Sequence, residues 1–259
     1  MVVEIGSEIR IRDASKELYD WAQENLIIPN PQYRERERRG LWVGNTPKYL
    51  WLYHVDGSDL IVPTGVGKQV RQFLSEKDQI YVHLADNGLL DYKGTIPLYD
   101  YQKEAVEVMQ RTSCGILQSP CGSGKTQMGI ALAAELGRKV LWVTHTQDLL
   151  IQSKTRAEQY FSSETLGTIT AGKAQVGSHI TFATVQTLCK MDLEQFRYTW
   201  DVVIVDECHR LAGSPTQVTM FYKVMNSLAA RHKYGLSATV HRSDGMIKST
   251  FAVLGPVIY

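Results

Sequence analysis

A glycine-rich loop near the middle of the chain carries residue types that could hold a phosphate group. Residues 119–126 read Ser-Pro-Cys-Gly-Ser-Gly-Lys-Thr. Gly122 and Gly124 allow the backbone to curl so that its N–H groups point toward phosphate oxygens. We expect Lys125 to contact the β- and γ-phosphates of a nucleotide, and the Thr126 hydroxyl to bind Mg²⁺. The residues expected to bind the nucleotide in this loop are Pro120, Cys121, Gly122, Ser123, Gly124, Lys125 and Thr126.

The flanks of the loop support this interpretation. It follows the apolar run Cys114–Leu117 and opens a helical run, Thr126–Leu136, which Gly137 would end. Strand, loop and helix in this order are the context that a phosphate-binding loop needs. Ser119 is a departure, because the usual spacing begins with glycine. The alternative is a glycine-rich turn before a helix, with Lys125 merely solvated.

Two adjacent acids follow another apolar run. Val202–Val205 precedes Asp206 and Glu207, which predicts a buried strand whose carboxyl end presents carboxylates. We expect Asp206 to bind Mg²⁺, directly or through water, and Glu207 to orient or deprotonate an attacking water. Paired acids at a dry strand end are costly unless a cation neutralises them. The alternative is a strand that runs into a polar turn. The predicted catalytic residues are Lys125, Asp206 and Glu207, and the predicted metal ligands are Thr126 and Asp206.

The elements that must position these residues alternate from about residue 98 onward. Helical stretches such as Thr126–Leu136 and Gln147–Phe161 separate short apolar runs, and this alternation predicts an α/β fold with a parallel sheet covered on both faces. The expected strands are Cys114–Leu117, Val140–Val143, Ile180–Ala183, Val202–Val205 and Tyr234–Ser237.

Residues 1–93 read instead as a small α+β unit, so we divide the chain into domains at 1–93 and 94–259. Asp56-Gly57 signals a hairpin turn, and turn and linker residues gather between 86 and 94. The expected elements are strands over Val2–Ile11, Tyr49–Val55 and Leu60–Pro63, a helix over Ser15–Leu26 and a short helix over Gly67–Leu74.

The loop and the acid pair together resemble the first motor domain of superfamily 2 helicases and translocases. Residues 206–209, Asp-Glu-Cys-His, match a DECH form of the DEAD/DEAH box. The resemblance implies a RecA-like P-loop domain that binds ATP and Mg²⁺. The run 98–102 resembles the upstream glutamine motif, in which Gln102 would contact adenine. The alternative is an exposed glutamine at the start of a helix.

Three further segments resemble family motifs in the expected order. Residues 143–146 resemble motif Ia, 183–188 the Ib–Ic region, and 236–239 motif III. Hydroxyls and backbone N–H groups at strand ends can hold nucleic-acid phosphates without reading bases, although simple loop capping is the alternative. The resemblance implies nucleic-acid contacts by Thr144, His145, Thr184 and Gln186, and coupling of hydrolysis to strand movement by Ser237, Ala238 and Thr239.

The end of the chain narrows the resemblance to one branch. Residues 240–245, Val-His-Arg-Ser-Asp-Gly, are similar to the run that follows motif III in the XPB-like and type III restriction branch. Val240 replaces a proline of that run, and Ser237 replaces a threonine.

Residues 1–93 carry a weaker resemblance and a cluster of arginines. Residues 30–33, 41–44 and 60–65 resemble the N-terminal domain of phage recombination helicases of the UvsW type. The basic side chains Arg34, Arg36, Arg38 and Arg39 could bind DNA phosphates or form a solvated helix face. The aromatic side chains of Trp42, Tyr49, Trp51 and Tyr53 could stack on bases, but strand alternation favours a mostly buried role.

Composition excludes several classes of protein. The 259 residues have a net charge of +1, which argues against a polybasic binder but leaves room for a local basic groove. No apolar run reaches ~18 residues, as a transmembrane helix needs, and the acidic N-terminus lacks signal-peptide features. We therefore expect a cytoplasmic protein without membrane contact. The four cysteines form no CxxC pair and are expected to be free thiols.

The function that these residues predict is the ATP-binding motor half of a DNA helicase or translocase. Its expected partners are single-stranded or branched DNA and a second RecA-like domain, in cis or in trans, which supplies an arginine finger worth about 10³–10⁵ in turnover. We expect the chain alone to bind ATP·Mg²⁺ weakly and not to unwind duplex DNA. The alternatives are a DNA-binding module with a regulatory or inert ATPase half, the motor of a restriction enzyme, and an RNA helicase.

Overall fold

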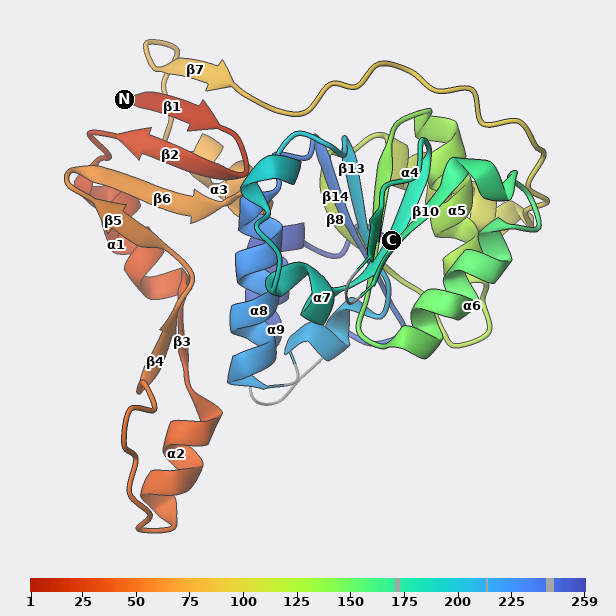
Figure 1. The fold of residues 1–259 in the computed structure, drawn as a ribbon. Coiled ribbons are helices and arrows are strands. Elements are labelled where there is room, and N and C mark those ends of the chain that lie inside the picture. Colours follow the sequence, from red (N-terminus) through yellow and green to blue (C-terminus); the bar gives the residue numbers. More distant parts are fainter. Residues whose placement is uncertain (171–172, 213, 241–244) are drawn as a thin grey trace.

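Two sheets dominate the computed structural model, which describes residues 1–170, 173–212, 214–240 and 245–259 (Figure 1). The larger sheet has the strand order β11-β10-β12-β9-β13-β14-β8, and all its neighbouring strands are parallel except β11 against β10. Its strands are β8 (Cys114–Gln118), β9 (Val140–Thr144), β10 (Leu166–Thr170), β11 (Lys173–Gln175), β12 (Ile180–Thr184), β13 (Val202–Val205) and β14 (His232–Ser237).

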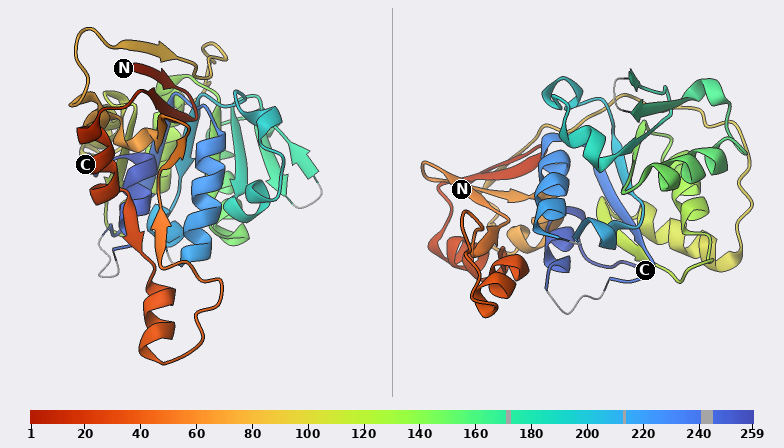
Figure 2. Two further views of the ribbon diagram at one scale, coloured as in Figure 1. Left: turned by 90° about the vertical axis from the view of Figure 1, so that its left-hand side faces the viewer. Right: turned by 60° about the horizontal axis from the view of Figure 1, so that its bottom comes forward.

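Helices cover both faces of this sheet, as predicted. On one face, Trp142 and Ile204 pack with α4, α5 and α6; on the other, Leu141 and Val203 pack with α7, α8 and α9 (Figures 1 and 2). Neighbouring residues of one strand thus serve opposite layers, which is why the central strands are apolar throughout. The helices are α4 (Asp100–Gln110), α5 (Lys125–Leu136), α6 (Gln147–Ala157), α7 (Val185–Cys189), α8 (Pro215–Ser227) and α9 (Ile247–Leu254).

All five strands expected in this part are present, but β10 and β11 were not predicted. Glycine and threonine interrupt the apolar character of β10, and β11 is a three-residue strand with the sequence Lys-Ala-Gln. Close backbone contact helps to place β10, because a Cβ on Gly167 would lie 2.1 Å from the Gly177 nitrogen. Gly167 lies in β10 and Gly177 in the loop before β12, so no local pattern predicts this contact.

The smaller sheet has the order β5-β6-β2-β1-β7. The prediction of one strand over Val2–Ile11 is wrong, because the chain reverses at Gly6-Ser7 and its halves pair antiparallel. Val3 lies opposite Ile11 in that pairing, and cross-strand partners share a face, so the alternation of apolar residues hides the reversal. The strands are β1 (Val2–Ile5), β2 (Glu8–Arg12), β5 (His54–Asp56), β6 (Asp59–Pro63) and β7 (Gln79–Val82).

The other expected elements of this part are confirmed or shortened. Helix α1 (Lys16–Asn25) begins after Ser15, whose hydroxyl accepts a hydrogen bond from the Leu18 nitrogen. The hairpin at Asp56-Gly57 joins β5 to β6. Helix α3 (Gly67–Arg71) is shorter than predicted and follows a 3-10 turn over Thr64–Val66.

An arm extends from the smaller sheet, away from the rest of the molecule (Figures 1 and 2). It consists of β3 (Ile27–Pro29), α2 (Pro31–Arg38) and β4 (Tyr49–Trp51), and β4 pairs with β3 rather than continuing into β5. Asn30 caps α2 by accepting a hydrogen bond from the Gln32 nitrogen. The expected single strand over Tyr49–Val55 is therefore two strands that belong to different ladders.

The smaller sheet shares a hydrophobic core with α8 and α9, two of the helices that cover the larger sheet. Val3 and Leu60 lie in one buried cluster with Val218 of α8 and Ala252 of α9. The backbones approach so closely here that a Cβ on Gly65 would lie 2.5 Å from the Gly255 nitrogen and 2.6 Å from the Ala252 oxygen. Glycine at position 65 is therefore required by the contact between the two parts.

The connecting segment after β7 runs along the second part of the chain rather than free in solvent (Figure 1). The Ala85 nitrogen donates to the Ala229 oxygen at 2.8 Å, and the Leu90 nitrogen donates to the Gly137 oxygen at 2.8 Å. Tyr92 also packs against the core formed by α4, α5 and α6. The proposed domain boundary at residues 93 and 94 falls within this segment.

The Gly65 contact makes a prediction about stability. We expect Gly65→Ala to lower the free energy of unfolding by about 1–3 kcal/mol, because the new methyl group meets backbone atoms that cannot rotate away. Denaturant unfolding followed by circular dichroism measures the change. Gly67→Ala is the matched control, since its Cβ would lie 3.4 Å from the Ile9 side chain. Equal stability of the two variants would contradict the close contact.

Candidate nucleotide and nucleic-acid site

The predicted loop and acid pair meet at one edge of the larger sheet. The loop follows β8 and the acids follow β13, and β14 lies between these strands and ends in Ser237. Because the three strands are parallel, their carboxyl ends share an edge, which is where ligands bind in open α/β sheets. The fold thus brings together residues separated by about eighty positions in the sequence.

The glycine-rich loop has the backbone shape that phosphate binding needs. Gly122 and Gly124 have φ angles of 80° and 83°, in the left-handed region that favours glycine. Gly124 immediately precedes α5, so the first N–H groups of that helix face the loop. Lys125 is only 7% exposed, and its Nζ donates to the Ser119 and Pro120 oxygens at 3.1 and 3.2 Å.

The loop explains why serine is acceptable at position 119. The Ser119 hydroxyl donates to the Ser123 hydroxyl at 2.7 Å, and Ser123 donates in turn to the Pro120 oxygen at 2.7 Å. These two hydrogen bonds connect the beginning and the end of the turn. A glycine at position 119 could not make the first of them.

Gln102 supports the loop from α4. It is buried, which contradicts the alternative of an exposed glutamine. Its Oε1 accepts from the Tyr99 nitrogen at 2.9 Å, and its Nε2 donates to the Ser123 oxygen at 2.8 Å. Tyr101 donates to the same oxygen at 2.9 Å. The contact of Gln102 with adenine stays a prediction.

Asp206 is 4% exposed and surrounded by donors from three elements. Its Oδ2 accepts from the Thr126 hydroxyl at 3.4 Å and from the Ser153 hydroxyl at 3.2 Å, while its Oδ1 accepts from the Glu207 nitrogen at 3.0 Å. Burial, together with the charge of Glu207, raises the pKa of Asp206 to about 6. A buried carboxyl that is costly to ionise is one that a bound cation would stabilise, so the two predicted metal ligands fit Mg²⁺.

Most of the ligands of such an ion would come from outside the protein. Within the described ranges, no group of three or more His, Cys, Asp or Glu side chains is arranged to hold a metal. Mg²⁺ commonly binds through one or two protein ligands together with substrate phosphates and water. The pair Thr126 and Asp206 agrees with that mode of binding.

Glu207 has an unusual backbone conformation. Its φ of 49° is left-handed, which costs a non-glycine residue on the order of 1–3 kcal/mol. Its Oε1 lies 3.9 Å from the Lys125 Nζ, and its Oε2 lies 3.3 Å from the His209 Nδ1. The conformation therefore aims the carboxylate across the site, between the loop lysine and the last residue of the DECH segment.

His209 connects the acids to motif III. Its Nδ1 lies 2.9 Å from the Ser237 hydroxyl, which donates to the Thr239 oxygen at 2.6 Å and accepts from the Thr239 nitrogen at 3.2 Å. The turn that contains Ala238 is closed by these bonds. Glu207 and motif III are thus joined through one imidazole ring.

A cavity of about 610 Å³ lies beside these residues. The loop and both acids line one side, and α6 supplies Gln152, Ser153 and Arg156 on another. Ser153 and Arg156 are not among the site residues predicted from the sequence. The available signal was the polar Ser153 on the buried face of α6, between Leu150 and Ala157.

The four residues predicted to contact nucleic acid in this part lie at the ends of two paired strands. Thr144 and Thr184 are register partners in β9 and β12, and the Gln186 Nε2 donates to the His145 oxygen at 3.0 Å. Both threonine hydroxyls are used locally: Thr144 donates to the Thr146 oxygen, and Thr184 caps α7. Loop capping thus accounts for the two threonines, while His145 and Gln186 are half-buried at the surface.

The predicted arginine cluster lies on the arm, around α2. Arg34, Arg38 and Arg39 are exposed; Arg39 pairs with Glu35 at 2.6 Å, and the Arg36 guanidinium donates to the Trp42 oxygen at 3.4 Å. The arginine cluster therefore has a solvent-exposed face. The alternative interpretation, binding of DNA phosphates, stays a prediction.

The aromatic side chains of the arm correct a second expectation. A mostly buried role is wrong for Trp42 and Trp51, which are 85% and 57% exposed, and for Tyr49, which is also exposed. Only Tyr53 is buried. A protruding two-stranded arm has no layer to cover its side chains, so alternation along its strands does not decide burial.

The branch-specific run after motif III lies largely outside the described residues, since it includes residues 241–244. Among the described residues no helix is both long enough and apolar enough to cross a lipid bilayer.

The comparisons with known proteins agree with the prediction of a helicase or translocase motor domain. Residues 95–242 match the family model described as Type III restriction enzyme, res subunit. The DNA 3'-5' translocase XPB2 of Sulfurisphaera tokodaii is 29% identical over 197 residues, covering 74% of this chain and 42% of that protein. The DNA 3'-5' helicase XPB of Mycobacterium tuberculosis is 26% identical over 171 residues, covering 62% of this chain and 30% of the relative. The chain spans less than half the length of these relatives.

Solved structures extend the likeness of fold to the N-terminal part. A crystal structure of the UvsW helicase from bacteriophage T4 has a TM-score of 0.68 at 20% identity and covers 99% of both chains. The SWI2/SNF2 ATPase core of Sulfolobus solfataricus in complex with dsDNA has a TM-score of 0.53 at 18% identity, covering 64% of this chain and 38% of the other. Because the family model matches more than half of the 259 residues, the chain belongs to the family described as Type III restriction enzyme, res subunit, with a first motor domain of the superfamily 2, XPB-like kind.

Proposed function

We propose that the chain is the ATP-binding motor half of an ATP-dependent DNA helicase or translocase that remodels or unwinds DNA in repair or recombination. The observation that carries the proposal is the meeting of Lys125, Thr126, Asp206 and Glu207 around one cavity at the carboxyl edge of the sheet. The names of the relatives, a DNA translocase and a DNA helicase, support the choice of DNA.

The roles of the residues follow from their contacts. Lys125 exchanges its bonds to two loop carbonyls for bonds to phosphate oxygens, and the loop N–H groups hold the remaining phosphate charge. Thr126 and Asp206 hold Mg²⁺, which when bound offsets charge on the transferred phosphoryl group. Glu207 orients the attacking water and accepts its proton.

The link from Glu207 through His209 to Ser237 is the proposed coupling path. A change at Glu207 alters the hydrogen-bond partner that is available to the His209 ring. The His209 ring in turn contacts the Ser237 hydroxyl, which closes the motif III turn. The path needs a second RecA-like domain opposite this edge, in cis or in trans, to convert the change into movement along DNA and to supply an arginine finger.

Nucleotide binding and hydrolysis can be separated by two substitutions. We expect Lys125→Ala to weaken binding of ATP·Mg²⁺ at least tenfold, because the phosphates lose their only buried ammonium among the described residues that line the cavity. Isothermal titration calorimetry on the 259-residue chain measures this. Lys103→Ala, on the exposed surface of α4, is the control. Unchanged affinity in the first variant would contradict the phosphate role of the loop.

Glu207→Gln tests the role of the second acid. We expect ATP affinity within about threefold of the unaltered chain, and hydrolysis slower by roughly 10²–10⁴-fold, because the amide cannot accept the proton of the water. Single-turnover assays with protein in excess over ATP, with and without DNA, measure the rate in the motor completed by its second RecA-like domain, which supplies the arginine finger. Equal rates for the two proteins would exclude the motor mechanism.

The arm supplies the proposed DNA contact outside the motor. Arg34 and Arg38 are exposed cations on α2, and replacing both with alanine should weaken DNA binding and reduce the slope of log affinity against log salt by about 0.9 for each lost phosphate contact. Fluorescence anisotropy at several salt concentrations measures the slope. The control is Lys16→Ala with Lys77→Ala, which removes two exposed cations of the same N-terminal part. A similar loss in both double variants would remove the arm from the interface.

A further inference from the structure

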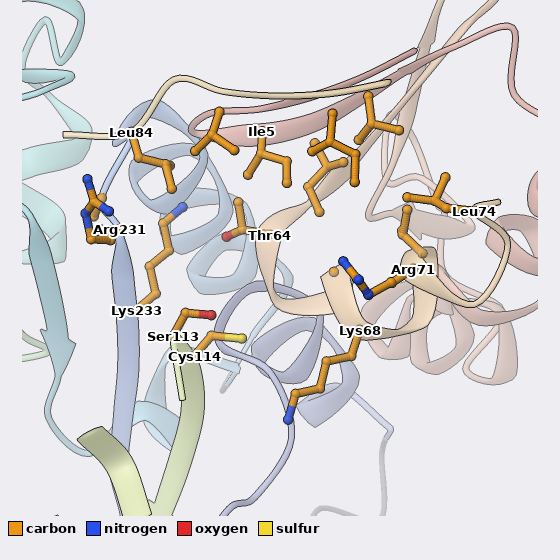
Figure 3. Close-up of a pocket in the computed structure, with 17 residues that line it drawn as sticks. Ile5, Thr64, Lys68, Arg71, Leu74, Leu84, Ser113, Cys114, Arg231 and Lys233 are labelled. Carbon is orange, nitrogen blue, oxygen red and sulfur yellow. The ribbon is translucent and has the colours of Figure 1, made fainter. Parts of the chain in front are cut away.

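A second cavity lies far from the nucleotide site, between the smaller sheet and the motor domain. It has a volume of about 370 Å³, which is within the range of small-molecule pockets. Its apolar walls come from three elements of the smaller sheet and from α3, including Ile5 of β1, Ile9 of β2, Val82 of β7 and Leu74 after α3. The motor domain closes it with the starts of β8 and β14 (Figure 3).

The charged side chains of this cavity are all cationic. Lys68, Arg71, Arg231 and Lys233 line it, and no Asp or Glu is among its described lining residues. Figure 3 shows the Arg71 guanidinium turned toward the cavity, whereas the Lys68 amino group points away from it. Among the described residues, the Arg71 guanidinium has no hydrogen-bond or ion-pair partner, although its backbone oxygen accepts from the Leu74 nitrogen. Arg231 is partly neutralised by Asp86 at 3.3 Å.

Lys233 is fixed inside the wall rather than mobile. Its Nζ donates to the Ser7 oxygen at 3.0 Å and to the Met225 oxygen at 2.8 Å, which leaves one of its three N–H groups. Burial lowers the pKa of Lys233 to about 7, although the charge of Glu8 opposes that effect. An anion beside this ammonium would favour its charged form.

Two polar atoms in the same wall are buried without a hydrogen-bond partner. They are the Thr64 hydroxyl oxygen and the Arg231 Nε. Buried polar groups are satisfied in the great majority of native structures, so orphans that line a cavity indicate a polar group of a ligand. Thr64 and Lys233 project into the same space in Figure 3, with Arg71 on the opposite side.

We propose that this cavity binds an amphipathic monoanion, namely a medium-chain acyl carboxylate. The apolar body lies between Ile5, Val82 and Leu74. The carboxylate lies near Thr64 and Lys233, where it accepts hydrogen bonds from the hydroxyl and the ammonium, and Arg71 supplies the opposing positive charge. Because the walls come from both parts of the chain, a bound ligand stabilises the seating of the smaller sheet on the motor domain.

Isothermal titration calorimetry of the 259-residue chain with decanoate, below its micelle concentration, tests the proposal. We expect one site per chain, with decanoate binding at least tenfold more tightly than decylammonium, which has the same apolar body and the opposite charge. Tighter or equal binding of decylammonium, or no binding of decanoate, would overturn the proposal.

Matched charge reversals locate the site. We expect Arg71→Glu to weaken decanoate binding at least fivefold and Lys77→Glu to change it less than twofold, since both residues are exposed, both lie in the smaller part, and only Arg71 lines the cavity. Circular dichroism verifies that both variants fold.

Val82→Trp, at an exposed position of the mouth, should also weaken binding by filling the apolar space. Equal effects of the two charge reversals, or unchanged binding in Val82→Trp, would exclude this cavity as the site.

Discussion

Two adjacent carboxyl groups at the end of a buried strand set the conditions for the rest of this molecule. Asp206 is held by hydroxyls from α5 and α6, and Glu207 is aimed by a left-handed backbone toward Lys125 and His209. Asp206 is buried, and its ionisation is unfavourable without nearby positive charge. Lys125 places one ammonium within reach of Glu207, and Thr126 with Asp206 would hold the divalent ion that we propose. The edge of the sheet is therefore arranged for a ligand that brings cations and phosphates together.

The same arrangement accounts for the local strain. A left-handed glutamate persists only where the surrounding structure determines its conformation, and here β13, the His209 contact and the loop lysine all do so. The strain lies at the residue that is proposed to activate water, and one imidazole connects it to Ser237 at the end of the neighbouring strand. Glu207 and the motif III turn thus share a contact through His209, which the proposed coupling of hydrolysis to movement would use.

The N-terminal part is not an independent appendage. Its sheet shares a core with α8 and α9, and Gly65 allows backbone contact that no other residue permits. In contrast, the arm with α2 leaves the body of the protein and keeps Trp42 and three arginines exposed. The smaller sheet is thus packed on the motor domain, whereas the arm presents a basic and aromatic surface to solvent.

The sequence by itself determined the chemistry and the order of the motor elements. Gly122 and Gly124 predict a tight loop before a helix, and an apolar run that ends in Asp206 and Glu207 predicts a buried strand, so both features could be predicted from local sequence. Only the tertiary structure decided which distant groups complete the site and which surfaces are exposed. Ser153 reaches Asp206 across 53 positions, and the reversal at Gly6-Ser7 leaves the apolar pattern unchanged. Trp42 is exposed because none of the described elements covers the arm. Such exposure could not be predicted, because a local sequence pattern reflects only neighbours along the chain, whereas burial and contacts depend on segments that meet after folding.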